Sequence, residues 1–214
     1  MHTIIKIILV ALALIIASAY GFYHWLTIAP TQAERPVING VHYVGATVSD
    51  LSRTEKLYKE SFDLRHVTRD VISNNATFNT LAEREGVVAQ SSLMKGANAQ
   101  LRFMTFANRS VAAEVTQHVG PNGPGIAHIC FQVNQKTQAY EHFLAGGAKH
   151  IGAKEMMQVN PKNPVYYAYA YDQDKLMVEV EHVDVAALNL PTPPKNDFRI
   201  RHISLATNDM DRAV

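Results

Sequence analysis

One histidine lies inside a short apolar run, and it is the first residue whose surroundings suggest chemistry. His128 belongs to the run Ile126–Val133, which follows two glycines and a proline that favour turns. Such a run is typical of a buried strand, so we expect little water around the imidazole. A buried imidazole needs a partner for each ring nitrogen, and a metal ion is one such partner. The alternative is a histidine that only satisfies hydrogen bonds inside a core.

The composition excludes several classes of function. The chain has 214 residues, with 20 Lys and Arg against 19 Asp and Glu, and 47% of its residues are hydrophobic. This content is enough for one sizeable core, but the balanced charge leaves no basic excess to hold phosphates, so we expect no nucleic-acid binding. The single cysteine, Cys130, excludes a disulfide within the chain and a thiolate metal cluster. In its apolar run it is expected to be a small buried hydrophobic residue.

The first 30 residues differ from everything that follows. Lys6 precedes the unbroken apolar run Ile7–Ile16, and Ala17–Ala19 fits the small-x-small pattern of a signal-peptidase site. Residues 1–30 are therefore expected to be a signal peptide or, if uncleaved, a membrane anchor, since Ile7–Ile28 is long enough to span a bilayer. Either outcome predicts an exported protein, periplasmic or anchored to the outer face of the inner membrane.

The elements that must position His128 belong to a unit that occurs twice. In residues 37–106 the hydrophobic pattern predicts a strand, a helix and three further strands, at 37–48, 51–62, 64–72, 87–94 and 101–106. In residues 123–185 the same order recurs, at 126–133, 137–144, 149–151, 165–171 and 176–183. One copy alone would leave an open sheet face, so the two copies are expected to pair around a shared core.

The last part of the chain predicts the beginning of a further unit. Residues 186–197 include a proline-rich stretch typical of a linker. Residues 198–214 then predict a strand and the first turn of a helix, as at the start of each earlier unit. A lone strand and helical turn cannot bury themselves, so this segment is expected to be disordered or docked on a sheet edge, as the truncated start of a longer natural protein.

Several stretches resemble a known superfamily. The stretch Val41–Leu51 followed by Leu57 and Tyr58, and the later stretches Gly125–Val133, Ala145–Ala148 and Tyr171–Val180, are similar to the modules of vicinal oxygen chelate proteins. This superfamily includes glyoxalase I, bleomycin-resistance proteins and extradiol dioxygenases. The resemblance implies an α+β fold in residues 37–185, in which two paired βαβββ modules form a curled mixed sheet around a cavity, here preceded by an N-terminal apolar helix.

The same resemblance implies a divalent metal in the cavity, iron first and otherwise manganese, zinc or nickel. Its ligands come from the first and last strands of each module. His128 falls in the histidine position of the second module, and Glu179 falls in the terminal carboxylate position, although Glu181 lies on the same strand face. Tyr169 matches a tyrosine found near the metal in the extradiol branch and is the candidate catalytic residue. Alternatively it is one of several aromatic residues that line a strand.

The first module departs from the superfamily pattern. Its histidine position is held by Tyr43, and His42 lies one place early, where strand alternation sends it away from the cavity unless a bulge intervenes. Its carboxylate position falls near Arg102, which repels a cation and suits an anionic substrate. With such a bulge, His42 is a third candidate metal ligand. Tyr43 and Arg102 are candidate substrate-binding residues.

These features favour an exported metal-dependent enzyme, a dioxygenase or lyase, that acts on a small oxygenated molecule. An extradiol-type dioxygenase is the specific version. Two alternatives stay open: a metal-free small-molecule-binding module of the bleomycin-resistance type, and the non-catalytic half of a longer protein whose active pair of modules begins at His202. The expected partners are a small-molecule ligand or substrate, the membrane if the N-terminal segment is uncleaved, and a second copy of the chain in a homodimer.

Overall fold

A computed structural model describes Ser18 and residues 41–81, 83–107, 125–158, 160–189 and 195–213. The chain divides into the units Met1–Gly40 and Val41–Val214. Apart from Ser18, the predicted signal peptide or anchor at 1–30 lies outside the described residues, and the predicted linker at 186–197 is described only at its two ends. Within the described part of the chain, no helix is long and apolar enough to cross a membrane.

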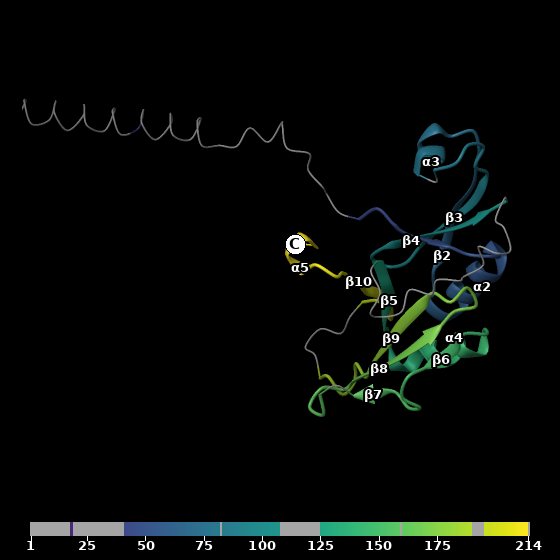
Figure 1. Cartoon of the computed structure of the whole chain (residues 1–214). Coiled ribbons are helices and arrows are strands. Elements are labelled where there is room, and N and C mark those ends of the chain that lie inside the picture. The colour runs from purple at the N-terminus through teal and green to yellow at the C-terminus, as the bar shows by residue number, and fades with distance from the viewer. Residues whose placement is uncertain are drawn as a thin grey trace, which may run out of the picture. The chain divides into compact units, whose positions relative to one another are not determined.

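The first copy of the predicted unit forms a four-stranded sheet with helices (Figure 1). Its elements are β1 (Val44–Thr47), α2 (Leu51–Phe62), β2 (Arg65–Ile72), α3 (Ala76–Leu81), β3 (Ala89–Lys95) and β4 (Gln100–Phe106). The strand order is β1-β4-β3-β2, with β1 parallel to β4 and the other neighbours antiparallel. The predicted order of strand, helix and three strands is confirmed here, and α3 is an addition that the hydrophobic pattern does not indicate.

The second copy forms the other sheet. Its elements are β5 (Gly125–Asn134), a 3-10 turn (Gln135–Thr137), α4 (Ala139–Ala145), β6 (Lys149–Ile151), β7 (Met157–Gln158), β8 (Val165–Tyr171) and β9 (Met177–Val183). The later segment adds β10 (Phe198–Ala206) and α5 (Met210–Ala213). The strand order is β10-β5-β9-β8-β6, and β7 pairs with β8 beside this path.

The mixed sheets confirm the α+β class, but the described strands form two sheets where the sequence predicts one curled sheet. The reason lies in β10, which pairs antiparallel along β5 (Figure 1). The opposite side of β5 pairs with β9, so β10 closes the remaining edge of β5 to any strand of the first unit. The segment expected to be disordered or docked is therefore docked on an edge.

Helix α2 forms where its local sequence signals place it. The Asp50 side chain caps its first turn by accepting a hydrogen bond from the backbone N–H of Arg53 at 3.0 Å. The buried residues recur every three or four positions, at Leu51, Thr54, Leu57, Tyr58, Ser61 and Phe62. This spacing gives the helix one apolar face, which packs against the rest of the protein.

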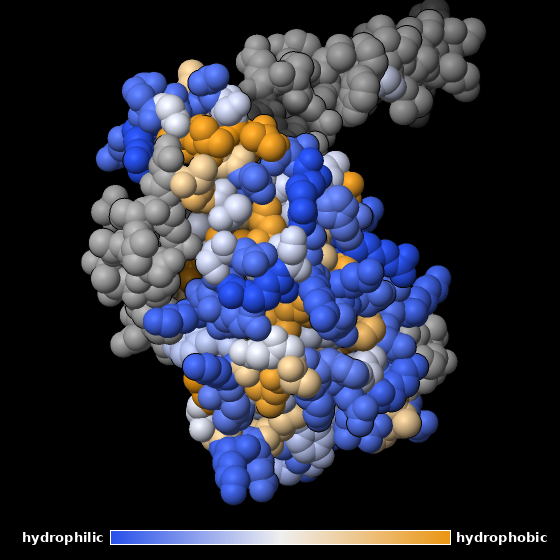
Figure 2. All heavy atoms as spheres, turned by 90° about the vertical axis from the view of Figure 1, so that its right-hand side faces the viewer, coloured by the Kyte–Doolittle hydropathy of each residue, from blue (hydrophilic) through white to orange (hydrophobic). Residues whose placement is uncertain are grey.

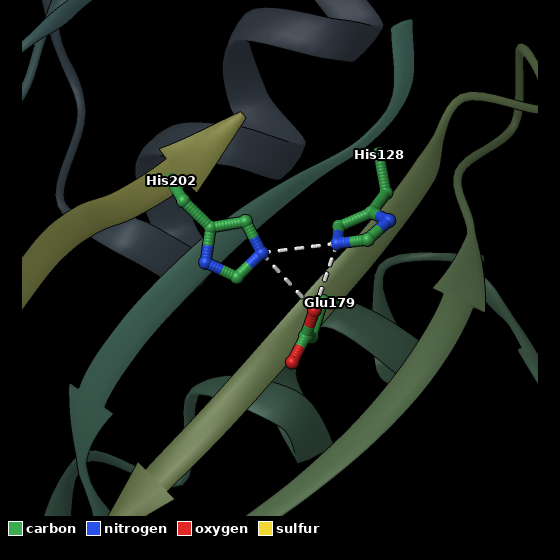
Figure 3. Close-up of side chains that lie close together, drawn as sticks. All are labelled: His128, Glu179 and His202. Carbon is green, nitrogen blue, oxygen red and sulfur yellow. Dashed lines mark hydrogen bonds and ion pairs between the residues drawn. The ribbon is translucent and has the colours of Figure 1, made fainter. Parts of the chain in front are cut away.

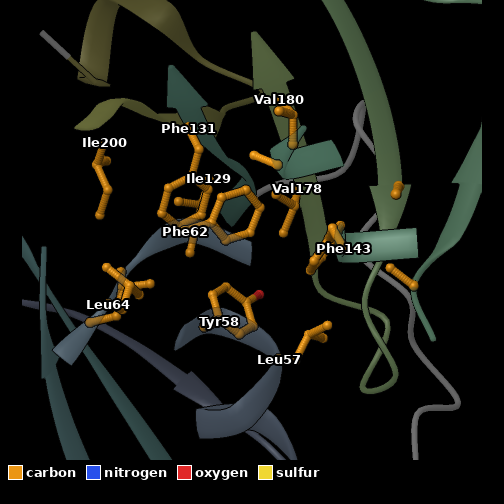
Figure 4. Packing of buried hydrophobic residues seen from close by; sticks show 14 of the residues in the cluster. Leu57, Tyr58, Phe62, Leu64, Ile129, Phe131, Phe143, Val178, Val180 and Ile200 are labelled. Atoms are coloured by element: carbon orange, nitrogen blue, oxygen red, sulfur yellow. The ribbon is translucent and has the colours of Figure 1, made fainter. Parts of the chain in front are cut away.

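The core is shared by the two copies, as the sequence predicts. Phe62 of α2 stacks on Phe131 of β5 with ring centroids 3.9 Å apart, and Phe143 of α4 lies 5.2 Å from Phe62 (Figure 4). Ile200 of β10 belongs to the same buried cluster, so β10 contributes to the core as well as to the sheet. The face shown in Figure 2 is mostly hydrophilic with separate hydrophobic areas, as expected when the apolar side chains gather inside.

Acidic residues in the β8–β9 turn tie the second copy to α2 of the first. The buried Tyr58 hydroxyl donates to Asp172 Oδ2 at 3.0 Å. Asp174 accepts from the Ser49 backbone N–H at 2.8 Å and forms an ion pair with Arg53 at 3.2 Å. These contacts fix α2 relative to the beginning of β9, the strand that carries Glu179.

Candidate metal centre

Three neighbouring strands bring candidate ligands to one face of the second sheet. Cys130 of β5 is the ladder partner of Glu179 on β9 and of His202 on β10. Ladder partners project their side chains to the same face, and His128 lies two residues before Cys130 on that face. A glutamate and two histidines therefore lie around Cys130 on one face of the sheet.

These side chains converge on one point (Figure 3). His128 Nε2 lies 2.9 Å from Glu179 Oε2 and 3.1 Å from His202 Nε2, and His202 Nε2 lies 3.5 Å from the same Glu179 oxygen. Ligands about 2.1 Å from a metal and at right angles around it are separated by about 3 Å. The spacing thus fits three ligands on one face of a divalent metal.

A β-bulge turns His202 toward this point. The pairing of β10 with β5 shifts between Ile200 and His202, so Arg201 has no ladder partner. In a regular strand Arg201 and His202 would point to opposite faces, whereas one extra residue lets both point to the same face. Arg201 forms an ion pair with Glu181, which lies two residues after Glu179 on β9.

Glu179 is held as a carboxylate. Burial raises its pKa, but hydrogen bonds from His128 and Tyr169, together with the charges of the two nearby histidines, outweigh burial and leave the pKa below its ordinary value. Tyr169 behaves in the opposite way. Its pKa is raised by burial and then by the charge of Glu179 and the hydrogen bond to it, so the phenol keeps its proton and donates to the carboxylate.

The structure brings together three of the six residues that the sequence singles out. His128 and Glu179 are in contact, and the Tyr169 ring meets the His128 ring edge-on at 5.5 Å.

The other three predicted residues lie at the first sheet. His42 is exposed, precedes the start of β1 and contacts the Tyr43 ring at 5.4 Å. The Arg102 guanidinium lies 4.6 Å from the centre of the Tyr43 ring, a cation–π contact. None of the three belongs to the group formed by His128, Glu179 and His202 among the described residues.

His202 is the residue that sequence reasoning missed as a ligand of this centre. It occupies the opening position of what reads as a third unit, so the sequence assigns it to a later site. The signal that could have found it is the repetition itself. The third unit has a histidine at its opening position, whereas the first unit has Tyr43 there and His42 one place early, so the first unit lacks a histidine in register.

A second group of possible ligands shares Glu179 and is already satisfied. The side chains of Cys130, Glu179 and Glu181 lie within 4.8 Å of one another. Glu181 accepts a hydrogen bond from Gln132 Nε2 at 2.9 Å and pairs with Arg201. Burial, followed by the charges of the two glutamates, raises the pKa of the Cys130 thiol, which therefore stays protonated. A protonated thiol is a poor metal ligand.

A cavity of about 710 Å³ opens beside the centre and includes Glu179 and Tyr169 in its lining. One part of the wall is apolar, from Val165, Tyr167 and Val183, and another is polar, from Gln132 and Arg199. Small-molecule sites in proteins have volumes of about 300–1,000 Å³. The candidate ligands therefore adjoin a space that can hold a small molecule.

No family model and no curated protein matches this chain. Solved structures do match it. A glyoxalase family protein from Bacillus cereus superposes with a TM-score of 0.59 at 13% sequence identity, covering 71% of this chain and 98% of that chain. The chain has the vicinal oxygen chelate fold. The resemblance seen in the sequence is thus confirmed at the level of the fold.

Two fosfomycin resistance proteins of the FosX type match with lower scores. The protein from Listeria monocytogenes, complexed with Mn(II) and 1S,2S-dihydroxypropylphosphonic acid, gives a TM-score of 0.45 at 15% identity, covering 71% of this chain and 95% of that chain. The protein from Mesorhizobium loti gives 0.42 at 17% identity, covering 67% and 91%. The fold rests on the match to the glyoxalase family protein alone, and at 13% identity that match leaves the reaction to be argued from the site.

Proposed function

We propose that this chain is a metal-dependent enzyme that binds its metal through His128, His202 and Glu179 and acts on a small oxygenated molecule. An iron-dependent dioxygenase of the extradiol type is the specific version. One observation carries the proposal: two imidazole nitrogens and one carboxylate oxygen meet within 3.5 Å beside a cavity. Two histidines and one carboxylate on one face of the metal are the donor set of non-haem iron oxygenases.

The donor set suits a divalent first-row metal. Neutral imidazoles bind iron, manganese, zinc and nickel, and the single carboxylate supplies a negative charge that favours a cation. A metal held on one face would supply a Lewis-acid centre with open positions for substrate oxygen atoms. The sequence also allows the hypothesis that this chain is the non-catalytic half of a longer protein whose active modules begin at His202. That hypothesis loses its main support for the described residues, because His202 belongs to this group.

The protein's own residues have separate tasks in this proposal. Tyr169 donates to Glu179 and so fixes the orientation of that carboxylate, as partners of metal ligands commonly do. The apolar part of the cavity wall, formed by Val165, Tyr167 and Val183, offers contacts to a ring. On the polar wall, Arg199 offers a guanidinium to an oxygen-bearing or anionic substituent.

Oxygen consumption tests the proposal. The metal-free protein is loaded with Fe(II) without air and given a panel of catechols, while dissolved oxygen and the absorbance of ring-opened product are followed. We expect oxygen uptake matched by product, abolished in Glu179→Gln and His128→Ala. The matched control is His42→Ala, which removes an exposed histidine of the first sheet and should keep full activity. Stoichiometric iron binding without turnover on any catechol would contradict the dioxygenase version.

A metal-free binding module is the second candidate, and the first sheet provides its support. Arg102 has a buried Nε without a hydrogen-bond partner, and its guanidinium contacts the Tyr43 ring. This pair could bind an anionic aromatic ligand. The reading predicts thermal stabilisation by aromatic carboxylates in the presence of a chelator, lost in Arg102→Met and kept in His128→Ala.

We also propose that the protein is exported, on the support of the apolar segment in residues 1–30. Residues 1–40 fused to a reporter enzyme that is active only outside the cytoplasm should give activity. Replacing Leu12 and Leu14 by Asp should abolish it. Equal activity of both fusions would contradict the proposed export.

A further inference from the structure

We infer that Arg201 is a positioning residue for the metal centre, because its ion pair with Glu181 holds the bulge that turns His202 toward Glu179. The inference rests on the proposed function and adds how its third ligand is placed. His202 is on β10, which among the described strands pairs with β5 alone. Side-chain contacts must therefore fix both the register of β10 and the direction in which its side chains point.

The apolar anchors of β10 require the extra residue. Ile200 is buried in the core, and Ile203 packs against the same core. Residues three apart on a regular strand face opposite sides, so both can face the core only if one residue is added between them. The register shift lies at that place, and it leaves Arg201 and His202 together on the other face.

Glu181 is a fixed acceptor for Arg201. Its carboxylate side chain is 8% exposed, belongs to the inner strand β9 and accepts a hydrogen bond from Gln132 on β5. The ion pair thus joins the bulged residue of β10 to the two strands that hold the other ligands. Without the guanidinium, Glu181 would be a buried carboxylate lacking its cation, close to Glu179.

The same strand provides a matched control. Arg199 lies on the same face as Arg201, and its Nε donates to Gln132 Oε1 at 2.7 Å. Gln132 is also its ladder partner, so Arg199 precedes the bulge and is in regular register. Arg199→Met and Arg201→Met each remove one guanidinium and keep most of the apolar stem, but only the second removes the contact that holds the bulge.

The first measurement uses the metal-free protein. The imidazole rings of His128 and His202 have centroids 5.2 Å apart, which is close enough for a nuclear Overhauser effect between their ring protons. We expect this effect in the wild type and in Arg199→Met, and its loss in Arg201→Met. If Arg201→Met does not fold, Glu181→Gln breaks the same ion pair from the other side and is measured instead. Persistence of the effect in the folded variant overturns the inference.

The second measurement is Mn²⁺ affinity in a double-mutant cycle. Arg201→Met should weaken binding by about 10- to 100-fold, the range seen when a residue that orients a metal ligand is lost. In a His202→Ala background the same change should have no further effect, because Arg201 acts through His202. Arg201→Lys should restore part of the affinity.

The two measurements separate the inference from the proposed function. Tighter Mn²⁺ binding by Arg201→Met would overturn the inference, since it would make the freed Glu181 a ligand. Additive losses in the cycle would also overturn it. A loss of the imidazole contact in Arg201→Met, with no metal bound by the wild type, would support the positioning of His202 and refute the metal-dependent enzyme.

Discussion

Asp172 is expected to make the fold less stable as the pH rises through the range 4 to 6. Its side chain is buried, with Oδ2 accepting from the Tyr58 hydroxyl at 3.0 Å and Oδ1 accepting from the Leu176 N–H at 2.8 Å. Burial raises its pKa from 3.8 to about 6, and these hydrogen bonds offset only part of the increase.

The sign of the effect follows from proton binding. Between pH 3.8 and about 6 the folded state holds the Asp172 proton and the unfolded state has lost it, so a rise in pH favours unfolding. The resulting decrease in the free energy of unfolding is absent below the lower pKa and complete above the upper one. Two pKa units correspond to about 3 kcal/mol in the free energy of unfolding.

Urea unfolding of the wild type and Asp172→Asn between pH 4 and pH 8 measures this cost. Asparagine keeps an acceptor for the backbone and a polar partner for Tyr58, but it cannot ionise. The stability of the variant relative to the wild type should rise by up to about 3 kcal/mol across the range. Asp70→Asn, at an exposed acid on β2, is the control and should give a flat difference. A flat or falling difference for Asp172→Asn would refute the reasoning.

Two further predictions concern packing. Phe62→Ala should lower the free energy of unfolding by about 3–5 kcal/mol, because it removes a buried aromatic ring stacked on Phe131. Urea unfolding measures this loss, with Val71→Ala at an exposed position as the control. A loss equal to that of the control would contradict the packing. Asn98→Ala removes two hydrogen bonds to the Ile200 backbone, of 2.7 and 3.0 Å, and should speed amide exchange in β10 but not in β8, at a cost of about 1–3 kcal/mol. Equal exchange changes in both strands would show a global effect instead.

The parts of the fold that depend on local signals could be predicted from the sequence. Helix α2 spans Leu51–Phe62 as predicted, because its cap and its apolar spacing are both encoded within the helix. The second copy of the unit places His128 and Glu179 on adjoining strands, so their contact follows once the pairing is known. Tyr169 is beside them because β8 is the next strand after β9 in the sheet.

His202 could not be placed in the same way. Its position depends on which edge β10 occupies and on a bulge of one residue, and both are set by long-range contacts of Ile200 and Arg201. Face alternation could not be applied to His42 either, because β1 begins only at Val44 and leaves that residue outside the ladder.

The central claim is that two histidines from different strands bind one metal together with Glu179. Pulsed EPR of the protein with one equivalent of Mn²⁺ counts the imidazole nitrogens bound to the ion. The account predicts two in the wild type and in His42→Ala, and one in His202→Ala. A count of one in the wild type, or an ion that stays in solution, would contradict it.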